Sequence, residues 1–165
     1  LEFKNCAPCQ SKQYEFKLGN MAIDQSLFIL HPTESPPVLE ENGWKTVVPV
    51  AKSTEIIKNI ISRYLPEQKS WSDNLLIFEN NFIEVYVDTE DNKYIVAGIS
   101  LRVALKEIRD RKQLEGIANF VLSMTKELNL GLWGVKTAKY LFTVDNVLNE
   151  IALSSAGRLY KDKMT

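Results

Sequence analysis

The sequence predicts an α+β protein with a mostly antiparallel sheet, built on a central meander and packed against about three helices. Two runs of alternating apolar residues are separated by a polar turn, a short apolar run precedes them, and a stripe of apolar residues at helical spacing follows. Three consecutive strands form a meander, and a helix laid across it buries the apolar faces of both layers. The expected strands lie at 75–78, 82–88 and 93–103, and the expected helix at 112–128.

The first twenty residues are set apart from the rest. Met21 opens a stretch that resembles a natural start, so we expect 1–20 to be a tag or an N-terminal extension and 21–165 to form a single α+β domain.

Both cysteines of the chain, Cys6 and Cys9, lie in this first segment. Three interpretations are open: an incidental pair or local disulfide, a redox pair, and half of a zinc site. A thioredoxin-type pair opens a helix, whereas this pair precedes 13–18, which alternates like a strand. A structural zinc site needs four ligands, and the chain adds only His31.

A short apolar run predicts a strand at 26–30, before a segment with three prolines. Because proline has no backbone N–H to give to a sheet, we expect a loop here, with His31 solvated and inert. Asn42-Gly43 predicts a turn before a short strand at 45–48.

The next element is a helix at 54–65. Ser53 is suited to the N-cap and Pro66 marks the end, while the apolar side chains form a stripe that we expect to pack on the sheet.

The central hairpin follows from period-two alternation. Ile83, Val85 and Val87 alternate with polar or aromatic residues, and the polar turn at 88–92 leads into a second alternating run.

The helix at 112–128 has recognisable ends. Asp110 and Gln113 resemble a capping box, and Asn129 and Gly131 suit a left-handed C-cap. Two short strands, at 131–134 and 139–144, are expected next.

The last expected element is a helix capped by Asp145. Its buried side is predicted to contain Val147, Leu148, Ile151, Ala152, Ala156 and Leu159.

Composition excludes several classes of protein. The chain has 165 residues, of which 45% are hydrophobic and 25% charged, which is typical of a folded globular domain. The net charge of −1 disfavours a dedicated nucleic-acid-binding protein. Since no apolar run is long enough to cross a bilayer, we expect no membrane span.

The common catalytic motifs are absent from the sequence. It contains no Gly-rich phosphate loop, no His-Glu-x-x-His and no Gly-x-Ser-x-Gly elbow, and its single histidine limits the possible triads. We therefore assign no catalytic residue, no cofactor and no metal site.

An acidic cluster surrounds the turn of the central hairpin: Glu84, Asp88, Glu90 and Asp91. A calcium loop would need a different spacing and a glycine. Two interpretations remain, a solvated turn and a docking patch for a basic partner, in which opposite charges speed encounter.

From Phe82 onward the chain resembles small immunity proteins of bacterial contact-dependent growth inhibition and other polymorphic toxin systems. The resemblance covers about half of the chain, and the matching segments are 83–87, 99–103, 120–133, 147–150 and 154–159.

This resemblance implies a non-enzymatic protein of the bacterial cytoplasm. Such a protein binds a cognate toxin domain, often a basic nuclease, and occludes its active site. The four acidic residues would then face the toxin. A secretion or effector chaperone, and a thiol oxidoreductase that uses Cys6 and Cys9, are the alternatives.

Overall fold

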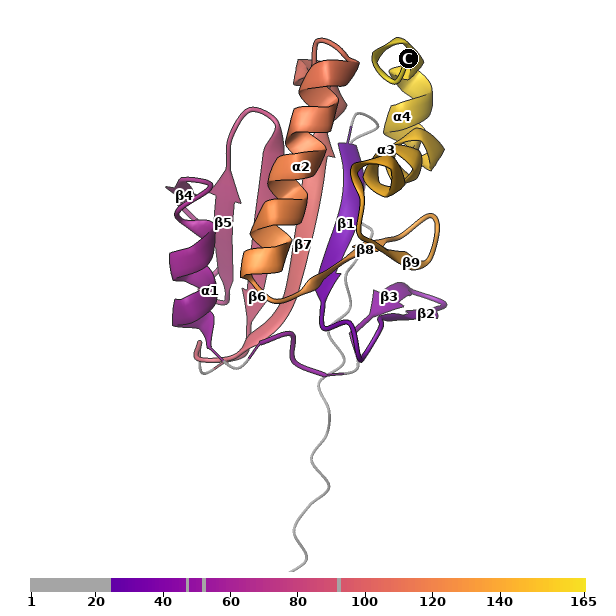
Figure 1. Ribbon diagram of the computed structural model, residues 1–165. Helices are drawn as coiled ribbons and strands as arrows, with labels where there is room; N and C mark the ends of the chain where they lie inside the picture. Colours follow the sequence, from indigo (N-terminus) through magenta and orange to yellow (C-terminus); the bar gives the residue numbers. More distant parts are fainter. Residues whose placement is uncertain (1–24, 47, 52, 92) are drawn as a thin grey trace, which may run out of the picture.

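The computed structural model describes residues 25–46, 48–51, 53–91 and 93–165, and these form an α+β fold (Figure 1). Seven antiparallel strands make one sheet in the order β4-β5-β6-β7-β1-β8-β9, and β2 and β3 pair separately. The predicted fold class is confirmed.

The strands are β1 (Gln25–His31), β2 (Val38–Glu40), β3 (Gly43–Lys45), β4 (Glu67–Gln68), β5 (Leu75–Glu79), β6 (Ile83–Thr89), β7 (Val96–Ala104), β8 (Gly131–Gly134) and β9 (Lys139–Leu141). The α-helices are α1 (Thr54–Ile61), α2 (Arg111–Glu127), α3 (Val144–Leu153) and α4 (Ser155–Leu159), with 3₁₀ turns at Leu105–Glu107 and Lys161–Lys163.

The predicted meander is formed by β5, β6 and β7, and local side chains explain its turns. The Asn80 side-chain oxygen accepts hydrogen bonds from the backbone N–H groups of Phe82 and Ile83, which closes the β5–β6 turn. At the next turn Lys93 has a φ of 61°, in the left-handed region. Strand β7 therefore begins at Val96, three residues later than predicted.

Strand β1 lies inside the sheet, between β7 and β8, although it comes first in the described chain. It pairs on one side with β7 and on the other with β8, with Ile29 opposite both Ser100 and Trp133. The prediction of a strand at 26–30 is thus confirmed, and the structure adds its two partners.

The helices cover one face of the sheet, as Figure 1 shows for α1, α2 and α3. Residues that pair across neighbouring strands point to the same face, and successive residues alternate between faces. The covered face contributes most of the core, which contains Phe28, Leu30, Phe78, Val85, Val87, Ile99 and Leu101 from strands and Ile57, Ile61, Leu114, Val121 and Met124 from helices.

The predicted caps of the first two helices are confirmed. The side chains of Ser53 and Asp110 accept hydrogen bonds from the N–H groups of Ile56 and Gln113. Helix α1 is four residues shorter than predicted, however. A proline disfavours the α-helical backbone conformation of the residue before it. Ahead of Pro66 the chain therefore leaves the helix through two tight turns, in which the backbone N–H groups of Arg63 and Tyr64 donate to carbonyl oxygens three residues earlier.

Three predictions for the C-terminal region are wrong in their boundaries. Thr143, and not Asp145, caps α3, because its hydroxyl accepts from the N–H of Asn146. The preceding strand therefore ends at Leu141. The predicted single last helix is split after Leu153, where the Ser154 hydroxyl accepts from the N–H of Gly157 and starts α4.

The predicted short strand at 45–48 is also displaced. The structure has β3 at Gly43–Lys45, paired with the unpredicted strand β2, and Gly43 has the positive φ of 117° that its turn requires. Val47 lies outside the described residues, as do 1–24 with their cysteine pair and proposed extension.

A buried carboxylate joins α3 to the β8–β9 turn. Glu150 is 1% exposed, and its two oxygens accept hydrogen bonds from the backbone N–H groups of Lys136 at 2.6 Å and Thr137 at 2.9 Å. Gly134 leaves room for this contact, because a Cβ there would lie 2.5 Å from a Glu150 oxygen.

Replacing Gly134 by alanine should therefore lower the free energy of unfolding by about 2 kcal/mol, since the new methyl group displaces the Glu150 carboxylate. The matched control is Gly116→Ala in α2, where a Cβ meets nothing within 4 Å. That change should raise the stability by up to about 1 kcal/mol through helix propensity. Urea unfolding followed by circular dichroism measures both, and equal midpoints would contradict the role given to Glu150.

Candidate functional site

The face of the sheet away from the helices is polar where it is formed by β6 and β7. Glu84, Tyr86 and Asp88 point to this face, while the intervening residues of β6 are buried in the core. Their partners on β7 are Arg102, Ser100 and Gly98. We call the side of the sheet that these residues define the open face.

The four predicted acidic residues are not one continuous patch. Asp88, Glu90 and Asp91 are close in sequence at the β6–β7 turn, whereas Glu84 lies roughly 13 Å further along β6 at the usual rise per residue. Glu84 is also occupied, because it accepts hydrogen bonds from Gln25 at 3.0 Å and from the Tyr86 hydroxyl at 3.1 Å.

The residues at the turn differ in their surroundings. Asp91 is exposed and accepts a hydrogen bond from the Asn74 side chain at 3.3 Å. Glu90 and Asp88 are half-buried. Burial raises the pKa of the Asp88 carboxyl to about 6, and the described residues give that carboxyl no hydrogen-bond partner.

Aromatic side chains adjoin these acids, an arrangement that no pattern in the sequence indicates. Trp71 is 75% exposed, and its ring centroid lies 5.9 Å from that of Tyr86. The Arg102 guanidinium carbon lies 5.0 Å from the Tyr86 ring centroid. Tyr94, in the same turn as Glu90, is 76% exposed. Exposed tryptophan and tyrosine are the residues that most often dominate protein–protein affinity.

The prediction that His31 is solvated is wrong. His31 is the last residue of β1, pairs with Gly131 and is fully buried. Its Nδ1 lies 3.4 Å from the carbonyl oxygen of Pro32, and its Nε2 has no hydrogen-bond partner among the described residues. Burial lowers the pKa of the imidazole, which favours the neutral ring.

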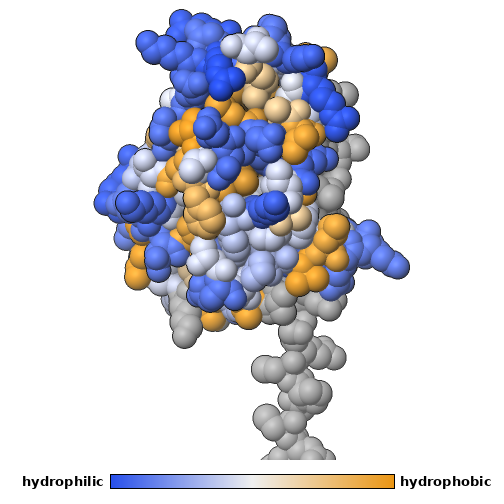
Figure 2. Space-filling view, turned by 45° about the vertical axis from the view of Figure 1, so that its right-hand side comes forward, coloured by the Kyte–Doolittle hydropathy of each residue, from blue (hydrophilic) through white to orange (hydrophobic). Residues whose placement is uncertain are grey.

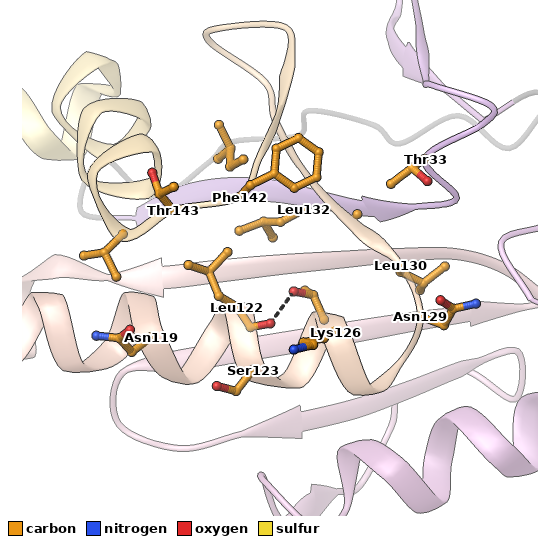
Figure 3. A pocket seen from close by; sticks show the side chains of 14 residues that line it. Thr33, Asn119, Leu122, Ser123, Lys126, Asn129, Leu130, Leu132, Phe142 and Thr143 are labelled. Carbon is orange, nitrogen blue, oxygen red and sulfur yellow. Dashed lines mark hydrogen bonds between the residues drawn. The ribbon is translucent and has the colours of Figure 1, made fainter.

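A groove lies on the opposite side of the sheet, between α2 and the β9–α3 connection (Figure 3). It has a volume of about 570 Å³. Leu132 and Leu141 come from β8 and β9, and α2 contributes Leu122 and Lys126. The sequence patterns did not predict this groove because its walls come from separate segments, α2 and the β9–α3 connection, which only the folded structure brings together.

The surface on this side of the molecule is mixed in character. In Figure 2 hydrophobic side chains are separated by hydrophilic ones and do not merge into one broad apolar area. Exposed apolar residues include Leu39 on the β2–β3 hairpin and Phe142 after β9.

Two kinds of feature are absent from the described part of the chain. No helix there is both long and apolar enough to cross a membrane. No group of three or more potential metal-binding side chains is found in those same residues.

The chain was also compared with known proteins, and no family model, no curated protein and no solved structure matched it.

Asp88 should make stability depend on pH. Because the pKa of its carboxyl is raised by folding, its favourable contribution is complete below about 3.8 and is lost as the pH rises through about 6. Asp88→Asn should therefore raise the free energy of unfolding by roughly 1–2 kcal/mol at pH 7.5 and change it little at pH 4. Urea unfolding at both pH values measures this difference.

The matched control is Asp73→Asn, at an exposed position nearby. It should change the stability by less than about 0.5 kcal/mol at either pH. An Asp88→Asn variant that is less stable than the wild type at pH 7.5 would show that the carboxylate has a stabilising partner.

Proposed function

We propose that this chain is a non-enzymatic bacterial immunity protein that binds a basic toxin domain and occludes its active site. The observation that carries the proposal is the association of exposed aromatic side chains with carboxylates at one end of the open face. Trp71 packs beside Tyr86, and Glu90 and Asp91 lie in the adjoining turn with Tyr94. The toxin domain is the expected protein partner, and the cytoplasm is the proposed site of action.

The other end of the open face, around Glu84, also supports a cationic partner. Across the open face Glu79 lies opposite Glu84, and Glu84 lies opposite Arg102. Like charges directly opposite each other on neighbouring strands destabilise a sheet, and here one arginine accompanies two carboxylates. A lysine or arginine from a partner would supply the missing positive charge.

The aromatic residues would contribute affinity, and the acids would contribute rate. A rigid exposed indole loses little conformational entropy on binding and buries a large apolar area. Carboxylates at the rim of an interface mainly accelerate encounter and select against acidic partners. This division of roles gives two separable measurements.

An effector chaperone is the second candidate, favoured by the groove between α2 and the β9–α3 connection. Such a protein would hold an apolar segment of its client there. The two functions differ in which side of the sheet contacts the partner. The oxidoreductase hypothesis rests on Cys6 and Cys9, which lie outside the described residues.

The first experiment is affinity capture of the tagged full chain from its native host, with mass spectrometry of the bound proteins. We expect one stoichiometric partner, the C-terminal domain of a large secreted protein. Glu90→Lys with Asp91→Lys should slow association with that partner at least tenfold, with a smaller effect at high salt.

The matched control is Glu107→Lys with Asp162→Lys. This pair makes the same change in net charge at two exposed positions distant in sequence from the hairpin turn. It should leave the association rate within about twofold. If both double variants lose the association rate equally, the acidic turn acts only through the net charge of the protein.

Trp71→Ala should weaken binding at least tenfold, mainly through faster dissociation, because it removes a large apolar contact area. Leu39→Ala on the β2–β3 hairpin is the control, and it should have little effect on affinity. Surface plasmon resonance with the captured toxin domain measures both rates. If Trp71→Ala binds like the wild type, the open face is not the toxin-binding surface.

A further inference from the structure

The groove between α2 and the β9–α3 connection has a polar rim composed of hydrogen-bond donors. Ser123, Lys126 and Asn129 follow one another at intervals of three residues near the end of α2, and all three line the groove (Figure 3). Ser123 and Lys126 are neighbours on the surface of α2, and Asn129 follows the end of the helix with a φ of 55°. The rim thus presents a hydroxyl, an ammonium and an amide along one edge.

These three side chains make no hydrogen bond or ion pair with the described residues, unlike other polar groups in the groove. Thr125 donates its hydroxyl to the carbonyl oxygen of Leu122, a bond drawn in Figure 3. Asn119 donates to the carbonyl oxygen of Glu115. The donors at the rim are therefore available to a ligand.

The charge of the lining is one-sided. Among the described residues that line the groove, Lys126 is the one ionisable side chain, and no acidic side chain accompanies it. A lysine that lines a concave site without a carboxylate favours a bound anion. A carboxylate would also accept the hydroxyl and amide donors, in charge-assisted hydrogen bonds.

Much of the remaining lining is apolar. Half-buried Leu122, Leu130 and Val144 form the apolar surface of the groove, above the buried side chains of Leu132 and Leu141. Phe142 is 69% exposed beside these residues. A large exposed phenylalanine next to a concave apolar lining is suited to cover a ligand.

The end of the groove near Thr33 is held by specific contacts. The Tyr140 hydroxyl donates to the carbonyl oxygen of Pro32. Gly131 permits close packing there, since a Cβ would lie 2.5 Å from the Tyr140 ring and 2.8 Å from the Thr33 methyl group. The walls are thus positioned without any ligand.

We propose that this groove binds a small amphipathic monocarboxylate. The carboxylate contacts Lys126, Ser123 and Asn129, and an aliphatic body lies on Leu122, Leu130 and Val144 beside Phe142. The volume of about 570 Å³ falls within the range of small-molecule sites in proteins. The site is separate from the surface proposed for the toxin, so either proposal can fail without the other.

The test titrates octanoate into the ¹⁵N-labelled full chain and follows the amide signals by NMR. Octanoate should shift amides within 119–132 and 141–144, with a Kd between about 0.1 and 1 mM. Octanol, which has the same body but no charge, should bind about fivefold more weakly. Butyrate should also bind more weakly, because it has less apolar surface to bury.

Two matched variants separate the charge from general effects. Lys126→Met keeps the length of the side chain and should weaken octanoate binding about fivefold or more. Lys112→Met makes the same change on α2 outside the groove and should leave the affinity within twofold. Circular dichroism checks that both variants fold like the wild type.

Three outcomes would overturn the proposal. One is the absence of amide shifts at 5–10 times the upper expected Kd. Another is that octanol and octanoate bind with equal affinity and that Lys126→Met has no effect. That result would show that the groove binds ligands only as an apolar surface. The third is that a peptide ending in leucine binds more tightly than octanoate, whereas the same peptide with a C-terminal amide does not. That result would assign the groove to the C-terminus of a protein chain.

Discussion

The structure depends on the backbone hydrogen bonds that β1 makes along both of its edges. Strands β7 and β8 are consecutive in the sequence except for α2, yet they do not pair with each other. Each pairs instead with β1, so the meander on one side and the β8–β9 hairpin on the other are joined through this one strand. Without it, two sheet edges would expose unpaired N–H and C=O groups, which folded proteins avoid. The apolar residues Phe28 and Leu30 add to this role because they lie at the centre of the core.

The same arrangement separates the two candidate surfaces. The acidic and aromatic residues belong to the meander, whereas the groove belongs to the β8–β9 hairpin and the helix before it. They also lie on opposite faces of the sheet. A buried carboxylate, Glu150, fixes the hairpin to α3, and Tyr140 fixes it to the loop after β1. The groove is consequently built on elements that are held in place at several points, as a site with a defined shape requires.

Local features of the fold could be predicted from the sequence, and non-local ones could not. Alternation in β6 and β7, the cap residues Ser53 and Asp110, and the stripe of α2 all depend on neighbours within a few positions. The burial of His31 depends on pairing with Gly131, a residue far away in sequence. The same limit applied to the surfaces. The sequence placed four acids around one turn, but the occupied position of Glu84 depends on Gln25 of β1, and the approach of Trp71 to Tyr86 depends on the connection between β4 and β5.

The position of β1 between two strands that come later in the chain also has a consequence for folding. Ribosomes make this strand before either of its partners, and β8 is made only after α2 is complete. The nascent chain must therefore keep an apolar strand without its sheet partners while most of the domain is synthesised. Folds in which distant segments pair have high contact order and fold slowly, and their unpaired strands are exposed to aggregation in the meantime. The chain thus gains a continuous sheet at the cost of a long interval in which its first strand has no partner.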